Sequence, residues 1–323
     1  MMAVINGNLK LDKEQIIQTT ELHDFISQHQ LPQLYVDEAK RWFFPLAKAI
    51  GEKQKKSSKT TILGINGAQG SGKSTLADLL AYLFSKKYQL NVVVLSIDDF
   101  YLTRQQREVL SKSVHPLLAT RGVPGTHDVG LAMNIIHSLC DVAGTTFIPR
   151  FDKATDDRVA EQNWDQISTS ADIIILEGWC LGAEQQPEED LLEPINKLEK
   201  EEDPDAIWRN YVNRQLGGLY QDLFNMIDIW IMLKAPSFDC VYQWRLEQEN
   251  KLRNSLSDST SGTGDNQVMD ESGVERFIQH YQRITEHLLD TLPGKVDYLF
   301  EMDKNRKIIK LKSCLLYTSD AAD

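Results

Sequence analysis

The feature that most constrains the fold is a run of eight residues, Gly67-Ala68-Gln69-Gly70-Ser71-Gly72-Lys73-Ser74. It matches the pattern G-x-x-x-x-G-K-[ST] in full. The apolar segment TILGI (61–65) precedes it, and the amphipathic segment TLADLLAYLF (75–84) follows it. Glycines in such a turn let the backbone direct its N–H groups inward, and the start of a helix favours anions. The context therefore predicts a phosphate-binding loop rather than a chance match in an ordinary strand–helix turn.

The same pattern predicts which groups hold the nucleotide. Lys73 is placed to bridge the β- and γ-phosphates of ATP, and the Ser74 hydroxyl to bind Mg²⁺. ATP and Mg²⁺ are therefore the expected cofactors. The expected nucleotide-binding residues are Gly67, Gln69, Gly70, Ser71, Gly72, Lys73, Ser74 and Thr75.

Apolar segments along the chain predict the fold class. Predicted strands occupy residues 61–65, 92–97, 172–177, 228–233 and 296–302, the last being the final strand, and predicted helices occupy 73–88, a polar stretch from 104, and 128–138. Continuous rather than alternating apolar runs are typical of strands covered by helices on both faces. We therefore predict an α/β chain: a three-layer P-loop NTPase fold with a mostly parallel sheet.

Composition excludes several classes of protein. The hydrophobic content of 41% is that of a globular chain, and no run of 18 apolar residues or signal peptide is present. The net charge of −12 disfavours nucleic-acid binding, and the basic run 53–59 lacks interleaved aromatic residues and is interpreted as a linker. Four scattered cysteines without a CxxC favour a reducing cytoplasm. The sequence carries no signal for an oligomeric state.

Carboxylates follow two of the predicted strands. Asp98 and Asp99 come directly after the strand 92–97, and Glu177 ends the strand 172–177. Ligands of open α/β sheets bind at the carboxyl ends of the strands, and a buried carboxylate is costly unless it is paired or holds a metal. We favour a functional role for the pair, although one of the two aspartates is also placed to cap a helix. A kinase differs from other NTPases in needing a base aimed at a substrate hydroxyl.

Cationic residues gather between the second and third sheet strands. Arg121, His127, Arg150, Lys153 and Arg158 lie within about forty residues of an otherwise acidic chain. For any one of them, pairing with Asp152, Asp156 or Asp157 is the alternative. As a group they predict a site for a small anionic acceptor.

Arg245 lies further along the chain, on a predicted helix. It is spaced to pair with Glu249 at i, i+4, and it is equally suited to reach the transferring phosphoryl group as a lid arginine. Both interpretations stay open from the sequence.

Six motifs in order resemble the glycerate kinases of the plant and cyanobacterial type and their bacterial and fungal relatives. They are GAQGSGKST (67–75), SIDDFYLT (96–103), RGVPGTHD (121–128), PRFDKA with DDR (149–158), LEGW (176–179) and WRLEQE (244–249), and they span roughly residues 60–305. Uridine kinase, pantothenate kinase and phosphoribulokinase are more distantly similar through the loop and an Asp-x-Phe.

The resemblance implies an ATP-dependent kinase that converts D-glycerate, a small anionic hydroxy acid, to 3-phosphoglycerate. It implies that Lys73, Asp98 and Glu177 act in catalysis, with Glu177 also at the metal. It places Tyr101, Arg121, His127, Arg150 and Lys153 with Asp98 at the acceptor site, and Arg245 on the lid. The alternatives are a kinase for a nucleoside or another small hydroxyl metabolite, and a non-catalytic nucleotide-binding regulatory protein, which the intact Asp98 disfavours.

The domain organisation follows from these assignments. We predict a helical N-terminal extension (1–58) and a P-loop kinase domain (59–312). An acidic helical insertion (184–222), whose run 184–205 is interpreted as solvated rather than a partner site, and a lid-like helix and loop (237–271) interrupt it. Within that loop 255–271 is expected to be mobile, and Ser272 with Glu275 has capping-box spacing. Residues 315–323 resemble a translated sequencing adapter, and 313–323 are expected to be a non-native tail.

Overall fold

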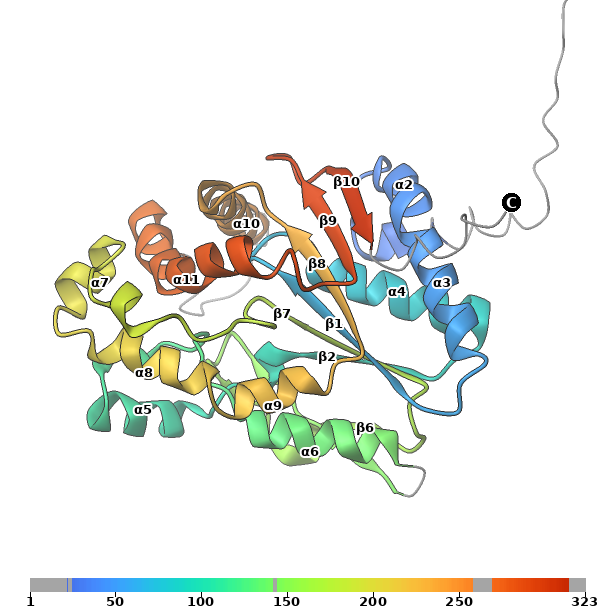
Figure 1. Cartoon of the computed structure of the whole chain (residues 1–323), viewed down its shortest axis with the longest axis horizontal. Helices are drawn as coiled ribbons and strands as arrows, with labels where there is room; N and C mark the ends of the chain where they lie inside the picture. Colours follow the sequence, from blue (N-terminus) through green and yellow to red (C-terminus); the bar gives the residue numbers. More distant parts are fainter. Residues whose placement is uncertain (1–21, 23–24, 142–143, 258–268, 314–323) are drawn as a thin grey trace, which may run out of the picture.

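A six-stranded sheet forms the centre of the computed structural model, which describes residues 22, 25–141, 144–257 and 269–313 (Figure 1). The strand order is β10-β9-β8-β1-β7-β2. The strands are β1 (Thr61–Gly67), β2 (Val92–Ser96), β7 (Ile173–Gly178), β8 (Ile229–Lys234), β9 (Tyr298–Met302) and β10 (Ile308–Ser313). All neighbours pair in parallel except β10, which is antiparallel to β9. The predicted α/β class with a mostly parallel sheet is confirmed.

The register of the sheet brings the carboxyl ends of its central strands together. Asn66 of β1 pairs with Gly178 of β7 and Met232 of β8, and Ser96 of β2 pairs with Glu177. The loops after β1, β2 and β7 therefore leave the sheet side by side.

Helices cover both faces of the sheet. The helices among the described residues are α2 (Tyr35–Glu38), the π-helix η1 (Ala39–Phe43), α3 (Phe44–Gln54), α4 (Lys73–Tyr88), α5 (Arg104–Ser113), α6 (Val129–Cys140), α7 (Lys197–Glu202), α8 (Ile207–Leu216), α9 (Leu219–Asn225), α10 (Phe238–Ser257) and α11 (Glu271–Thr291). Short 3₁₀ turns are η2 (Ile97–Phe100), η3 (Pro116–Ala119), η4 (Glu161–Asn163) and η5 (Glu188–Leu191). Two small hairpins pair β3 (Thr146–Ile148) with β6 (Asp165–Ile167), and β4 (Phe151–Asp152) with β5 (Asp157–Arg158).

The handedness of the crossovers sets the layers. The connection from β1 to β2 runs one way along the sheet, and the connections from β2 to β7, β8 and β9 run the other way. Because parallel crossovers are right-handed, α4 covers one face while α6 and α9 cover the other. In Figure 1, α7, α8, α10 and α11 gather at the end of the sheet toward which β1 and β8 point.

Aspartates at the opposite end of the sheet have a structural role. Asp228 accepts a hydrogen bond from the Ile62 amide at 2.9 Å, and Asp297 accepts one from the Trp230 amide at 2.8 Å. Each joins the start of one strand to its neighbour. Asp228 was predicted to begin a strand, but β8 starts one residue later, at Ile229.

The N-terminal helices pack against the main body. Phe43 lies edge-on to Phe300 of β9 with ring centroids 5.5 Å apart, and Leu46 and Ile50 are buried. This part of the predicted helical extension is therefore helical and buries one face. Residues 1–21 and 23–24 of the predicted extension lie outside the described residues.

The C-terminal edge differs from the prediction, because 296–302 is not the last strand. β10 has the pattern IIKLKS, in which lysines alternate on an edge strand, and an edge strand needs few apolar residues. It ends at Ser313, which pairs with Tyr298, one residue inside the predicted non-native tail. The rest of that tail lies outside the described residues.

The start of α11 also differs from the prediction. Asp270, not Ser272, is its N-cap, and its carboxylate accepts a hydrogen bond from the Gly273 amide at 2.7 Å. An aspartate satisfies the same open amides as a serine, so it ends the loop two residues earlier than predicted. Most of the predicted mobile loop, residues 258–268, lies outside the described residues. No helix in the described part of the chain is long and apolar enough to cross a membrane.

Candidate active site

The predicted phosphate loop connects β1 directly to α4. Gly70 and Gly72 have φ values of +77° and +89°, which side chains other than glycine resist. Lys73 and Ser74 occupy the first turn of α4, and no side chain caps that helix. The first amides of a helix have no intrahelical partner, so they are free to bind phosphate oxygens.

Glu177 connects the end of β7 to this loop. Its Oε1 accepts a hydrogen bond from Ser74 Oγ at 2.9 Å, and its Oε2 lies 3.7 Å from Lys73 Nζ. The side chain is buried, and among the described residues Oε2 has no hydrogen-bond donor. Lys73 is the cation paired with this oxygen in the structure, and the Ser74 hydroxyl and the Glu177 carboxylate are the kinds of oxygen ligand that fit a hard divalent ion.

Asp98 lies at the end of β2 and is held by two donors. Its Oδ1 accepts a hydrogen bond from Tyr101 Oη at 2.6 Å, and its Oδ2 lies 2.9 Å from Lys153 Nζ. Burial raises the pKa of Asp98, but Lys153, Lys73 and the Tyr101 hydroxyl together outweigh burial and hold this pKa well below its usual range. Asp98 is therefore a carboxylate at neutral pH, as an acceptor for a substrate hydroxyl must be.

Asp99 has a different environment. Arg150 Nη1 lies 2.7 Å from Asp99 Oδ2, and Arg150 Nη2 lies 2.7 Å from Asp165 Oδ2 on β6. Burial raises the pKa of Asp99, and Arg150 opposes that increase. Neither Asp98 nor Asp99 caps a helix, because the Ser96 side chain caps η2. Arg150 therefore ties the loop after β2 to the small hairpin β3–β6.

The other cations are also paired in this structure. Arg121 pairs with Asp156, as the ion-pairing alternative predicted, and its guanidinium lies 5.3 Å from the centre of the Phe151 ring. Arg158 donates to the Tyr101 carbonyl at 2.9 Å and lies 3.5 Å from Asp128. The predicted cationic segment thus surrounds Asp98 and Tyr101, but with carboxylates interleaved.

Arg107 is a residue of this region that the sequence did not indicate. It is 1% exposed and donates to the carbonyls of Leu102, Ala119 and Asp156 at 2.6–3.2 Å. It lies on α5, whose composition is otherwise polar and exposed, so only the three-dimensional structure separates it from a surface arginine. Arg107 fixes the chain segment that carries Arg121.

His127 is buried between two tyrosines. Its ring stacks on Tyr101 with centroids 4.7 Å apart, and its Nδ1 lies 2.6 Å from Tyr220 Oη. Burial lowers the pKa of His127 to about 4, so the imidazole is neutral at pH 7. Tyr220 belongs to α9 and was not identified from the sequence, because it lies 93 residues away.

Trp179 and Tyr281 form the wall behind Arg121. Their rings meet edge to face at 4.9 Å. Trp179 Nε1 donates to the Gly122 carbonyl at 3.0 Å, and Tyr281 Oη donates to the Arg121 carbonyl at 3.2 Å. A side chain at Gly122 would lie within 2.2 Å of Tyr281 Oη, so glycine is required for this approach.

The start of α10 lies against the phosphate loop. Any side chain on Gly70 would come within 2.9 Å of Trp244 Cβ, and Arg306, in the β9–β10 turn, donates to the Gly70 carbonyl at 2.9 Å. Arg245 pairs with Glu249 at 2.6 Å, which is the simpler of the two alternatives predicted for it. Its Nε is buried and has no partner among the described residues. Arg245 as a lid arginine stays a prediction.

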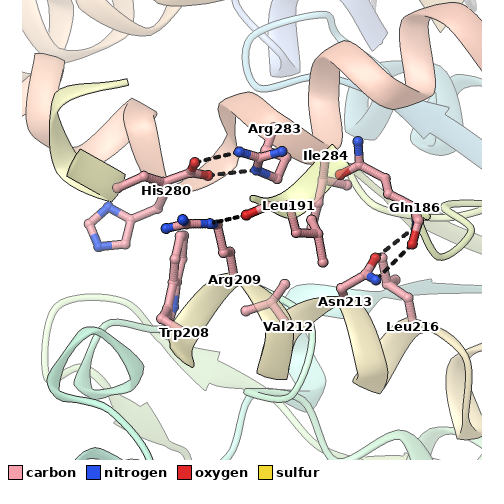
Figure 2. Close-up of a pocket in the computed structure, with 11 residues that line it drawn as sticks. Gln186, Leu191, Trp208, Arg209, Val212, Asn213, Leu216, His280, Arg283 and Ile284 are labelled. Carbon is pink, nitrogen blue, oxygen red and sulfur yellow. Dashed lines mark hydrogen bonds and ion pairs between the residues drawn. The ribbon is translucent and has the colours of Figure 1, made fainter. Parts of the chain in front are cut away.

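The acidic run 184–205 is mostly exposed, as predicted, but two of its carboxylates are buried in ion pairs. Glu199 is 0% exposed and lies 2.6 Å from Arg283 of α11, and Asp203 is 1% exposed and lies 3.1 Å from Arg209. Arg283 and Arg209 both line the cavity drawn in Figure 2. The cavity between these elements measures about 20 Å³, which is room for a water molecule and not for a substrate. It lies apart from the phosphate loop. The insertion is therefore fixed to α11 rather than built around a second site.

A phosphate-binding loop entering a helix, an ionised aspartate after β2 at the same end of the sheet and a helix packed on the loop define a P-loop phosphoryl-transfer enzyme. No protein-family model matches the chain. It is 33% identical over 267 residues to the uncharacterized kinase Mug58 of Schizosaccharomyces pombe, covering 78% of this chain and 89% of that protein. It is 30% identical over 230 residues to the chloroplastic D-glycerate 3-kinase of Arabidopsis thaliana, covering 68% of this chain and 47% of the plant protein.

The structure is similar to that of D-glycerate 3-kinase from Cryptococcus neoformans, with a TM-score of 0.67 at 23% identity, covering 83% of this chain and 96% of that one. This second likeness supports the fold. The chain belongs to the family of ATP-dependent P-loop kinases that contains these relatives.

Proposed function

We propose that this kinase transfers the γ-phosphoryl group of ATP to the 3-hydroxyl of D-glycerate, giving 3-phosphoglycerate. The observation that carries the proposal is the ionised Asp98, held by Tyr101 and Lys153 beside the loop that binds the nucleotide. The relatives named D-glycerate 3-kinase support the choice of acceptor.

D-glycerate carries the two groups that this site suits. Its hydroxyl is the nucleophile, and Asp98 is placed to accept the proton of that hydroxyl as the phosphoryl group arrives. Its carboxylate needs cations, and Arg121 and Lys153 supply them after exchanging Asp156 and Asp98 for the substrate. When Lys153 leaves Asp98, the largest influence that lowers the pKa of Asp98 is removed, and the carboxylate becomes a better base.

Residues around the phosphate loop are suited to bind ATP and a divalent cation. Lys73 is positioned for the phosphates, and Ser74 with Glu177 would hold Mg²⁺. When bound, Mg²⁺ neutralises charge on the phosphates. Gln69 Oε1 and Ser71 Oγ, both in the loop, are buried and unpartnered among the described residues, as expected for polar groups that meet a nucleotide.

The site disfavours the nucleoside alternative. A nucleoside base needs an open aromatic face, but Arg121 covers one face of Phe151, and Tyr101 meets that ring edge to face. Trp164 donates its indole N–H to the Val159 carbonyl at 2.8 Å. Phe151 is therefore covered, whereas the hydrogen bond of Trp164 fixes its ring without covering its faces.

The proposed setting is a reducing cytoplasm, without nucleic acid or membrane as partner. Cys140, Cys180 and Cys240 are all free thiols, which supports this setting. The net charge of −12 supports the exclusion of nucleic acid.

An acceptor panel coupled to ADP release tests the proposal. D-glycerate, uridine, cytidine, pantothenate and ribulose 5-phosphate are each added at equal concentration with Mg-ATP, and the glycerate product is identified as the 2- or 3-phosphate. We expect D-glycerate to stimulate ADP release most and to give 3-phosphoglycerate. A clear preference for another acceptor would leave the assignment as a kinase intact and would exclude D-glycerate as its substrate.

A further inference from the structure

The two ring nitrogens of the buried His127 differ in their hydrogen bonding: Nδ1 has a partner among the described residues, and Nε2 does not. The side chain is 6% exposed, and its Nδ1 lies 2.6 Å from Tyr220 Oη. Its Nε2 is buried and has no hydrogen-bond partner among the described residues. The question is which of the two nitrogens carries the proton.

The contacts of Tyr220 answer this question. Tyr220 Oη accepts a hydrogen bond from the Gly125 amide at 3.0 Å. Tyr220 is 2% exposed, and among the described residues Nδ1 of His127 is the one acceptor within hydrogen-bonding distance of its hydroxyl. A buried hydroxyl hydrogen without an acceptor is unfavourable, and donation to Nδ1 avoids that cost. The Tyr220 hydroxyl therefore donates to Nδ1, and the proton of the neutral imidazole is on Nε2.

The resulting Nε2–H is a donor in the acceptor region. His127 stacks on Tyr101, whose hydroxyl donates to Asp98 at 2.6 Å. Asp98 is also close enough to raise the pKa of His127 against the effect of burial. A buried N–H without an acceptor is unfavourable, so an oxygen of a bound molecule is the partner that this position lacks.

We propose that the Nε2–H of His127 is a fixed, neutral donor to an oxygen of the phosphoryl acceptor, and that Tyr220 is the positioning residue that fixes it. The inference rests on the proposed function, in which the acceptor is an anionic hydroxy acid. A neutral donor suits this position because an imidazolium would pair with Asp98 and compete with the substrate hydroxyl for that carboxylate.

The proposal gives the insertion 184–222 a role in the reaction. Tyr220 comes from α9, at the end of the insertion, and the buried pair of Glu199 and Arg283 holds the insertion on α11. The same α11 carries Tyr281, which bonds to the Arg121 carbonyl. The insertion and α11 thus support the loop 121–128 from two sides.

Nitrogen-15 NMR of histidine-labelled protein tests the tautomer directly and needs no activity. In the wild type we expect the His127 signals of a neutral ring protonated at Nε2, and the Nε2 shift should move when the acceptor binds. In Tyr220→Phe the ring packing is kept but the donor to Nδ1 is lost, so the Nδ1–H form should appear. The melting temperature of each variant confirms that it is folded.

Kinetics test the consequence for the substrate. We expect Tyr220→Phe to raise the acceptor KM about tenfold, the value of one buried hydrogen bond, while the KM for ATP stays unchanged. His127→Gln keeps an N–H near the position of Nε2 and should retain more acceptor affinity than His127→Asn, whose shorter side chain does not reach. Tyr298→Phe, which removes a buried tyrosine hydroxyl from β9, is the matched control and should leave both KM values unchanged.

Three outcomes would overturn the proposal. The first is an Nδ1–H tautomer in the wild type. The second is an Nε2 chemical shift that does not change at a saturating acceptor concentration. The third is an equal acceptor KM for His127→Gln and His127→Asn. If glycerate is not used and another acceptor in the panel is, the proposed substrate fails. The tautomer and KM measurements are then made with that acceptor, so the two failures are distinguishable.

Discussion

The ammonium group of Lys153 lies 2.9 Å from the carboxylate of Asp98, although Lys153 is largely exposed and Asp98 is mostly buried. Lys153 lies between the short strands β4 and β5, and Asp98 follows the edge strand β2. An exposed partner on a hairpin can be exchanged for a substrate, whereas a buried carboxylate on a sheet edge is fixed. This asymmetry allows Lys153 to keep Asp98 ionised without substrate and to release it when an acceptor arrives.

The pH dependence of the reaction should reveal this contact. Lys153 is the largest influence that lowers the pKa of Asp98, and burial opposes it. In Lys153→Met the pKa of Asp98 should therefore rise, and the acidic limb of kcat/KM for the acceptor should move to higher pH. Lys153→Arg keeps the charge and should leave the limb in place. An unmoved limb in Lys153→Met would show that Asp98 does not control the acidic limb.

The attachment of the insertion to α11 should dominate stability in that region. Arg283→Met leaves Glu199 buried at 0% exposure without its partner, and removing one member of a buried pair costs about 3–5 kcal/mol. Arg276→Met, on the same helix, breaks an exposed pair with Glu202 and should cost less than about 1 kcal/mol. Denaturant unfolding compares the two. Equal losses would mean that the Glu199–Arg283 pair does not hold the insertion.

Stability should fall as the pH is lowered from 6.5 toward 4. Burial lowers the pKa of His280, on α11, to about 4. In this window the unfolded chain binds a proton at His280 that the folded chain does not, so acid favours unfolding. His280→Gln should reduce the slope of the unfolding free energy by up to about 1.4 kcal/mol per pH unit. The exposed His137→Gln is the control, and an unchanged slope in His280→Gln would contradict the burial argument.

Local signals in the sequence predicted the nucleotide half of the site. The phosphate loop and the strands predicted at 92–97 and 172–177 are each recognised from about ten neighbouring residues, and in the structure Ser74 donates to Glu177. The acceptor half depends on contacts over long sequence distances. Tyr281 lies 160 residues from Arg121, and Tyr220 lies 93 from His127, so nothing near either residue marks its role.

Polar and charged segments did not predict which of their charged residues are buried. Glu199 lies in an acidic run typical of a solvated surface, and Arg107 lies on a polar helix, yet both are almost fully buried because each meets several partners from distant segments. β10 was missed because an edge strand tolerates lysines that a central strand does not. Each case needed a partner that the sequence could not supply.

Glycerate-dependent ADP release by Asp98→Asn tests the central claim most directly. The amide keeps the shape of Asp98 but cannot accept the hydroxyl proton, and a positioned base contributes about 10²–10⁴ in rate. We expect the variant to bind Mg-ATP as the wild type does and to lose the stimulation by D-glycerate at least a hundredfold. Stimulation within about tenfold of wild type, in a folded variant that binds Mg-ATP normally, would contradict the account.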